Sequence, residues 1–184
     1  MGSKWGSNED IHIGDIFQCW FGPYVGQPDS DYYQVAALRG RTQVVLRPLR
    51  TESYLNEDIE EGSPLYWLRE RNRPLPGQFM TAGELTALVR YERGKEIRRT
   101  GEEVTAWVLP DRTVEGRLLL QEIHWKSSFS LAQPEDWAPL DTETIRQMEE
   151  EYRQEKEDFA RRFLGEEGYA RFCEERAMEA GERT

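Results

Sequence analysis

The residues that could support nucleophilic chemistry in this sequence are few and lie far apart. The chain contains two cysteines, Cys19 and Cys173, and two histidines, His12 and His124. A catalytic thiol needs a base and an orienting group beside it. Cys19 lies in a predicted strand next to Trp20, and Cys173 lies on the apolar face of a predicted helix. We therefore interpret the cysteines as core thiols and the histidines as structural residues, and we predict no enzyme activity.

Motifs for metal ions and cofactors are also missing from the sequence. The cysteines form no Cys-x-x-Cys pair, and the two histidines give no zinc-ligand spacing. The acidic run at residues 57–61 lacks the spacing of an EF-hand loop. No glycine-rich loop of the phosphate-binding types is present. The sequence thus predicts no metal and no cofactor, and indicates a binding protein.

Arginines beside aromatic residues form a basic feature in this acidic chain. Four arginines and a single acid, Asp31, lie between residues 30 and 51, and more arginines follow an aromatic pair at residues 66–67. Such groups can clamp and stack on a nucleic-acid strand, or they can pair with acidic residues of the same chain or of a second copy. The predicted basic face consists of Arg39, Arg41, Arg47, Arg50, Tyr66, Trp67, Arg69 and Arg71.

Acidic residues are concentrated near the C-terminus. The 184 residues carry a net charge of −11. Residues 135–184 hold 16 Asp or Glu and 8 Lys or Arg, a net charge of −8, which leaves −3 for the other residues. This balance argues against generic binding to nucleic-acid phosphates and suits a basic protein partner or mimicry of a nucleic acid. The candidate partner-binding carboxylates are Glu149, Glu150, Glu151, Glu155, Glu157 and Asp158.

Short strands with period-two alternation should position the basic face. Residues 11–20 alternate apolar and polar side chains, with a turn or bulge at Gly14. A hairpin follows, whose turn uses Gly40 and whose second strand ends, or reaches a sheet edge, at Pro48. Residues 103–110 and 114–125 predict a second hairpin.

Between and after these hairpins the sequence predicts loops and a short helix. Residues 21–31, 51–64 and 126–139 are polar or rich in Gly and Pro, as is typical of exposed loops. Thr81 and Glu84 have the spacing of a capping box, which favours a helix within residues 81–94, although a strand competes there.

The C-terminal residues have helical periodicity. Asp141 and Thr142 are N-cap candidates, and Gly165 should end the first helix before a second, shorter one. A narrow apolar stripe on the first helix can pair with a second copy of the chain or pack back onto the sheet. The stripe consists of Ile145, Met148, Tyr152, Phe159 and Phe163.

The N-terminal part of the chain resembles small proteins carried by phages and mobile elements of bacteria. The pattern is Gly-Asp-Ile-Phe at 14–17, Asp-x-Tyr-Gln-Val at 31–35 and Val-x-Leu-Arg-Pro at 44–48. Residues 126–137 are similar to the segment that follows the last strand of those proteins. The resemblance implies a small β module in a bacterial cytoplasm and no particular activity. The acidic helical tail departs from the short members, which suggests an added function.

Together these features predict an α+β fold. We expect a disordered segment at residues 1–10, then a small curved antiparallel sheet or SH3-like barrel over residues 11–137. An acidic helical arm should occupy residues 138–184.

The predicted function is that of a non-enzymatic phage or mobile-element protein that binds and inhibits a host defence nuclease. In this anti-CRISPR-like role the acidic arm would act as a DNA mimic towards a bacterial partner such as a Cas-type nuclease. The alternative is a nucleic-acid-binding β module that uses the basic face, with the arm forming a homodimer. No apolar run approaches the 18 or so residues of a membrane-spanning helix, so we expect no membrane partner.

Overall fold

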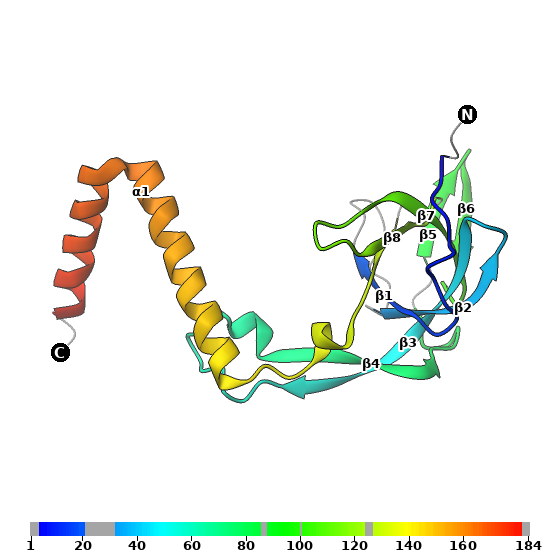
Figure 1. Ribbon diagram of the computed structural model, residues 1–184, viewed down its shortest axis with the longest axis horizontal. Helices are drawn as coiled ribbons and strands as arrows, with labels where there is room; N and C mark the ends of the chain where they lie inside the picture. Colours follow the sequence, from blue (N-terminus) through cyan, green and yellow to red (C-terminus); the bar gives the residue numbers. More distant parts are fainter. Residues whose placement is uncertain (1–3, 21–31, 86–87, 100, 124–126, 182–184) are drawn as a thin grey trace. The chain divides into compact units, whose positions relative to one another are not determined.

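The protein has an α+β fold with a curved antiparallel sheet and a C-terminal helix (Figure 1). The computed structural model describes residues 4–20, 32–85, 88–99, 101–123 and 127–181. The chain divides into two compact units. The sheet unit contains Met1–Tyr54 and Asn72–Ala138, and the helix unit contains Leu55–Arg71 and Pro139–Thr184.

The charge of the chain is unevenly shared between the two units. The sheet unit contains 16 Asp or Glu and 14 Lys or Arg, a net charge of −2. The helix unit contains 19 Asp or Glu and 10 Lys or Arg, a net charge of −9. The helix unit is therefore the strongly acidic part, and the sheet unit is nearly neutral.

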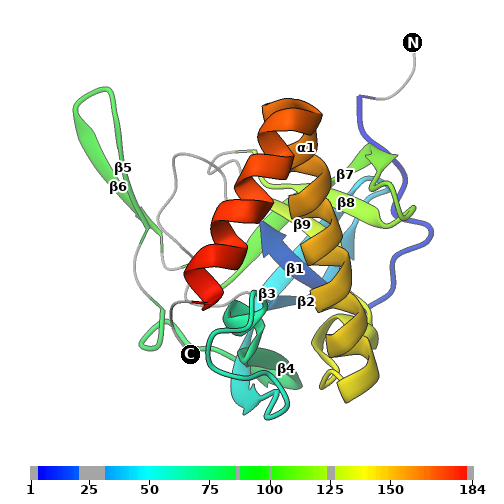
Figure 2. The ribbon, with the colours of Figure 1, turned by 90° about the vertical axis from the view of Figure 1, so that its left-hand side faces the viewer.

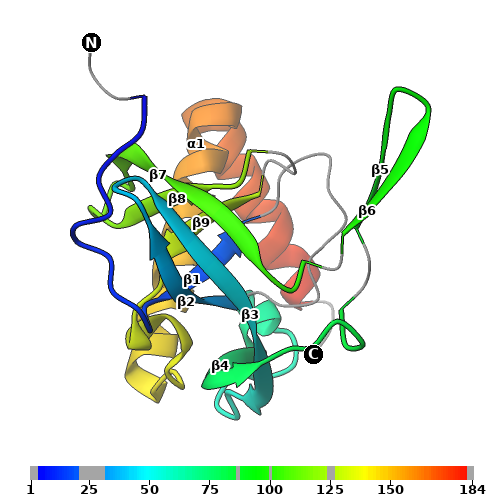
Figure 3. The same ribbon diagram turned by 90° about the vertical axis from the view of Figure 1, so that its right-hand side faces the viewer.

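Seven strands form the main sheet, in the order β2-β1-β9-β8-β7-β3-β4. All of the registers that are defined for this sheet are antiparallel, and β2 pairs with β3 as well as with β1, which requires strong curvature (Figure 3). This confirms the predicted curved antiparallel sheet. The strands are β1 (Ile16–Trp20), β2 (Tyr32–Arg39), β3 (Gln43–Leu55), β4 (Glu70–Phe79), β7 (Val104–Arg112), β8 (Leu118–Gln121) and β9 (Ser128–Leu131).

The core of the sheet unit is built from alternate positions of these strands. Val44 and Leu46 of β3 are buried, as are Ala106 and Val108 of β7. Because successive side chains of a strand point to opposite faces, Trp107, between the buried Ala106 and Val108, lies on the outer face, as does Val45 of β3, which is also buried. The same core also contains Phe17, Tyr33, Val35, Val104, Leu118, Leu120 and Phe129.

The first predicted hairpin is confirmed, but its second strand is longer than predicted. Gly40 in the turn has a φ of 58°, a conformation that favours glycine. Pro48 does not end β3; it is fully buried and pairs with Tyr33. Its carbonyl oxygen still accepts a hydrogen bond of 2.9 Å from the Met80 N–H, so the missing donor of proline does not break the sheet. The predicted loop at 51–64 is therefore wrong for residues 51–55.

Two other sequence predictions are corrected. Thr81 and Glu84 do bond to each other, yet residues 82–85 form a turn and the chain then enters β5 (Leu88–Glu92). β5 pairs with β6 (Lys95–Arg99) through Arg93 and Gly94, both with positive φ, as a type I′ hairpin turn requires. This turn explains why the segment forms a hairpin and not the predicted helix. Figure 2 shows the hairpin of β5 and β6 projecting from the sheet.

The predicted loop at 126–139 is also wrong in part. It contains the strand β9, which pairs with β1 and β8, and a 3-10 helix, η2 (Pro134–Trp137). The second predicted hairpin is confirmed as β7 and β8. The predicted loop at 21–31 lies outside the described residues.

The helix unit is built around the N-terminal end of α1 (Thr142–Gly181) and the 3-10 helix η1 (Tyr66–Leu68). The Asp141 carboxylate accepts a hydrogen bond of 2.7 Å from the Thr144 N–H, which confirms the predicted N-cap. Gly165 has φ 70° and ψ 169° and divides α1 into two helical segments, as predicted. The small core of this unit contains Ile59, Leu65, Leu68 and Ile145, with Leu140 and Met148 packed against it.

A buried asparagine joins the two parts of the helix unit. Asn56 is 3% exposed, and its side chain donates to the Leu68 carbonyl at 2.6 Å and accepts from the Leu140 N–H at 2.9 Å. Its backbone N–H donates to the Arg69 carbonyl at 2.8 Å. The residue thus fixes the start of α1 against the segment at 55–71.

Replacing this side chain should loosen the helix unit. We expect Asn56→Ala to lower the free energy of unfolding by about 2–4 kcal/mol, because a buried N–H and a buried carbonyl lose their partner. Urea unfolding followed by circular dichroism at 222 nm measures this. Asn72→Ala is the control, since Asn72 is exposed and its side chain accepts a hydrogen bond from the exposed Ser53 hydroxyl. This variant should change stability by less than about 0.5 kcal/mol. Equal effects of the two variants would contradict the role assigned to Asn56.

Candidate functional site

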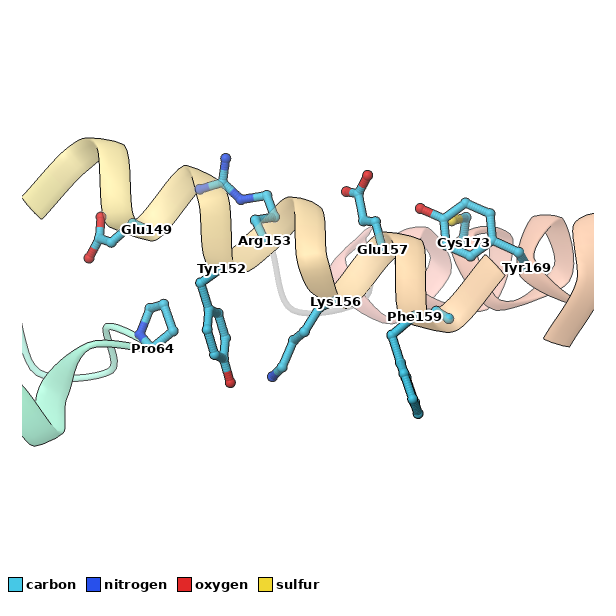
Figure 4. Close-up of a pocket in the computed structure, with 10 residues that line it drawn as sticks. Pro64, Glu149, Tyr152, Arg153, Lys156, Glu157, Phe159, Tyr169 and Cys173 are labelled. Carbon is cyan, nitrogen blue, oxygen red and sulfur yellow. The ribbon is translucent and has the colours of Figure 1, made fainter. Parts of the chain in front are cut away.

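The predicted acidic arm forms a carboxylate face on the first segment of α1. At 3.6 residues per turn, Glu150, Glu157 and Asp158 lie on the side of the helix away from the apolar stripe. Glu151 lies at the edge of that side, and Glu155, three residues after Tyr152 and four before Phe159, lies along the stripe. These five carboxylates are all exposed. Figure 4 shows Glu157 on one side of the helix and the aromatic side chains of the stripe on the other.

Some of the predicted carboxylates have partners within the helix unit, and others do not. Glu149 is half-buried and accepts a hydrogen bond from the Ser63 hydroxyl. Glu150 pairs with Arg153 one turn away, and Glu151 accepts from the Gln147 amide at 2.9 Å. Within the described part of the chain, no ion pair or hydrogen bond of a side chain is found for Glu155, Glu157 and Asp158. These three are the carboxylates most available to a partner.

The apolar stripe on α1 divides into a buried part and an exposed part. Ile145 is 4% exposed and packs, with Met148, against residues of the 55–71 segment. Phe159 and Phe163 are 70% and 79% exposed, and their rings stack with centroids 6.0 Å apart. The first turns of the helix are therefore anchored, while the later turns present an aromatic pair to solvent.

A groove of about 820 Å³ lies beside this aromatic pair. Pro64 and residues from both segments of α1 line it, and Figure 4 shows Tyr152, Lys156 and Phe159 directed to the same side of the helix. At its far end a hydrogen bond to Cys173 raises the pKa of Tyr169. The groove is thus lined by aromatic side chains together with acidic and basic side chains.

The sheet-unit half of the predicted basic face is only partly available. Arg47 lies over the Phe79 ring at 4.3 Å, and its Nε is buried without a hydrogen-bond partner among the described residues. Arg50 forms a two-bond ion pair with Glu84. Arg39 and Arg41 are exposed. The first two arginines therefore have structural roles, and the last two can reach a ligand.

The other half of the predicted basic face belongs to the helix unit. Tyr66 and Trp67 in η1 are 48% and 72% exposed. The Arg69 guanidinium lies 5.7 Å from the Tyr66 ring centre, and Arg71 is half-buried at the start of β4. Because the eight predicted residues are divided between separate units, each group has to be considered on its own.

An aromatic pair on the outer face of the sheet unit was not predicted from the sequence. Trp5 and Trp107 lie with ring centroids 6.0 Å apart, and the Lys4 ammonium is 5.0 Å from the Trp5 ring centre. The alternation of β7 indicates that Trp107 points outward, between the buried Ala106 and Val108. Nothing in the sequence indicates its contact with Trp5.

The ion pair of Arg50 with Glu84 lowers the pKa of this carboxylate in the sheet unit. The Glu84 oxygens accept hydrogen bonds of 2.8 and 3.0 Å from Arg50 and of 2.9 Å from the Thr81 N–H and hydroxyl. The bond from Arg50 and then those from Thr81 lower the pKa of Glu84 from 4.5 to about 2. The same contact raises the pKa of Arg50 further above its ordinary value.

Comparison with known proteins gives no relative for this chain. No family model, no curated protein and no solved structure matches it significantly. Within the described residues, no group of His, Cys, Asp and Glu is arranged to hold a metal ion. No helix in the same residues is both long and apolar enough to cross a membrane.

The lowered pKa of Glu84 gives a defined pH dependence. Since the folded-state pKa is below the unfolded value, the contribution of Glu84 to stability is present above pH 4.5 and is lost as the pH falls towards 2. We therefore expect Glu84→Gln to have a lower Tm than the wild type at pH 7, with a difference that shrinks over this window. Thermal unfolding at several pH values measures it. Glu9→Gln, at an exposed position, is the control; a pH-independent difference for Glu84→Gln would contradict the assignment.

Proposed function

We propose that this protein is a non-enzymatic binding protein of phage or mobile-element type that inhibits a host defence nuclease, in an anti-CRISPR-like manner. In this proposal the carboxylate face of α1 docks into the basic nucleic-acid groove of the nuclease and excludes DNA or RNA from it. The observation that carries the proposal is that Glu155, Glu157 and Asp158 project from an anchored helix without an ion pair among the described residues.

The charge density of the helix supports this role. Residues 149–158 contain six Asp or Glu and two Lys or Arg, a net charge of −4. With a rise of about 1.5 Å per residue, this is one net negative charge per about 3.8 Å. One strand of DNA carries one charge per about 3.4 Å of axis. The helix therefore resembles a single strand of DNA in its charge, and a basic groove that tracks such a strand would attract it.

The carboxylates of α1 are favoured over the predicted basic face as the principal site because more of them are available to a partner. Arg47 and Arg50 are already engaged with Phe79 and Glu84, whereas the carboxylates near the middle of α1 are exposed. The exposed pair of Phe159 and Phe163 would add an apolar anchor on the other side of the helix, for a groove that encloses the helix. Charged groups would steer the encounter, and the aromatic pair would slow dissociation.

A charge-neutralised helix tests the proposal. The probes are a purified Cas-type nuclease, with and without its guide RNA, and an unrelated basic DNA-binding protein. We expect the wild type to bind the nuclease at low salt and to inhibit DNA cleavage. Neutralising four carboxylates should weaken binding by about 10- to 100-fold, mostly through the association rate. The variant is Glu151→Gln, Glu155→Gln, Glu157→Gln and Asp158→Asn.

The matched control removes the same amount of charge from elsewhere in the helix unit. It should bind almost as the wild type does, because its carboxylates are exposed but do not lie on α1. An equal loss in both variants would show a net-charge effect only, and absence of wild-type binding at low salt would refute the proposal. The control is Glu57→Gln, Glu60→Gln, Glu61→Gln and Glu70→Gln.

The aromatic pair can be tested separately from the charges. We expect Phe159→Ser with Phe163→Ser to raise the dissociation rate from the nuclease at least about tenfold, as the loss of an anchor residue does, with no loss of helicity because both rings are exposed. Val114→Ser, at a fully exposed apolar position of the sheet unit, is the control. Light scattering on the same proteins reports whether the pair instead joins two copies. A dimer that the double variant loses would assign the pair to self-association.

A further inference from the structure

A row of polar and aromatic side chains crosses the outer face of four adjacent strands. Arg39 of β2 is paired with Gln43 of β3, Gln43 with Trp107 of β7, and Trp107 with Gln121 of β8. Paired residues of antiparallel strands point to the same face. This face is opposite to the core, because the neighbours Val44, Ala106 and Leu120 are buried. We call Arg39, Gln43, Trp107 and Gln121 the outer row.

The N-terminal segment adds a second ring to the outer row. The Gly6 N–H donates to the Val108 carbonyl at 2.9 Å, and a Cβ at Gly6 would lie only 2.7 Å from the Leu109 carbonyl oxygen. The segment therefore runs directly against β7. This places Trp5 on Trp107, with the planes of the two rings tilted by 38°. Both rings stay partly exposed.

A buried asparagine holds this N-terminal segment in place. Asn8 is 6% exposed, and its side chain donates to the carbonyl oxygens of Gly40 and Gln43 at 3.2 and 2.9 Å. Its backbone N–H donates to the Arg41 carbonyl at 2.8 Å. The position of Trp5 is therefore set by the fold before any ligand binds.

Exposed cations lie on or near the outer row. Lys4 lies over the Trp5 ring, and the Arg39 guanidinium reaches across β3 to the Thr105 hydroxyl at 3.4 Å. Arg41 is exposed in the turn that follows Arg39. The outer row itself contains no carboxylate. Two of its members, Gln43 and Gln121, carry amides, which can both donate and accept hydrogen bonds.

We propose that the outer row, together with Lys4, Trp5 and Arg41, binds single-stranded nucleic acid. A base stacks on the exposed part of the tryptophan pair, the three cations contact phosphates, and the two glutamine amides bond to base edges. Stacking platforms with flanking cations are the usual means of holding a single strand. A duplex is disfavoured because its base faces are already stacked on one another. This inference concerns the sheet unit and does not depend on the proposed role of α1.

Fluorescence anisotropy with labelled oligonucleotides of about 12 nucleotides tests this. The probes are oligo(dT), oligo(U), an abasic strand with the same phosphates, and a DNA duplex. We expect full-length protein to bind oligo(dT) or oligo(U) more tightly than the abasic strand and the duplex. The ratio of the dT and U affinities distinguishes DNA from RNA as the preferred ligand.

Two variants separate stacking from charge. Trp5→Ala should weaken binding of oligo(dT) or oligo(U) by about 5- to 150-fold, the range of a lost base–aromatic contact. Arg39→Gln should reduce the slope of log affinity against log salt by about 0.7, the value for one phosphate contact of a single strand. Arg73→Gln is the matched control, because Arg73 is an exposed arginine of the sheet unit that forms an ion pair with Glu52.

The outcomes are distinct from those of the nuclease experiment. The neutralised-helix variant should bind oligonucleotides at least as well as the wild type, which separates the two proposals. Thermal unfolding confirms that each variant is folded. If Trp5→Ala is destabilised, the salt dependence of oligonucleotide binding by Arg39→Gln tests the inference in its place. Equal binding of the abasic strand or the duplex would overturn the inference, as would wild-type affinity in both Trp5→Ala and Arg39→Gln, or no binding at low salt.

Discussion

Both candidate surfaces depend on a buried asparagine that satisfies backbone groups in turns and loops and at the ends of helices and strands. Buried N–H and carbonyl groups need hydrogen-bond partners, and irregular segments cannot provide them through a ladder. Asn56 bonds to the backbone of Leu68 and Leu140 in the helix unit, over sequence separations of 12 and 84 residues. Asn8 does the same for the backbone at Gly40 and Gln43 in the sheet unit, over 32 and 35 residues. An amide side chain suits this task because it carries two donors and an acceptor. Asn8 uses its amide group to donate to two carbonyls, and Asn56 both donates and accepts.

Each asparagine also sets the position of one surface. Asn56 fixes the residue that precedes the N-cap Asp141, so α1 begins at a defined point and its first turn packs through Ile145. Asn8 fixes the segment that carries Trp5 beside β7. The exposed groups that we assign to partners are thus attached to rigid anchors, which reduces the ordering cost of binding.

Local signals in the sequence predicted part of this structure correctly. The hairpin at Gly40, the Asp141 cap and the Gly165 break depend on neighbouring residues, so they were visible without the fold. The extension of β3 through Pro48 and the strand β9 were missed, because each depends on pairing with distant strands. The helix expected after Thr81 gave way to a hairpin whose two-residue turn, Arg93 and Gly94, was not recognised.

The candidate sites were predictable to a similar degree. Composition alone located the acidic helix, but only the structure shows that Glu149 bonds to Ser63 and that Glu155 is exposed without an ion pair among the described residues. The arginines of the basic face were visible in the sequence, while the engagement of Arg50 by Glu84 was not. The contact of Trp5 with Trp107 joins distant parts of the chain, and a single sequence carries no signal for such a pair.

The division of charge explains how one chain can offer an acidic and a cationic-aromatic surface. Exposed charges are largely screened beyond about 8 Å at physiological salt, so a ligand responds mainly to the groups close to it. The net charge of −11 therefore does not decide what the sheet unit binds, since that unit alone carries −2. Because the proposed site has three cations, Lys4, Arg39 and Arg41, its phosphate contacts would support a salt slope of only about 2. In that proposal stacking has to contribute most of the affinity, whereas the carboxylates of α1 would act through charge.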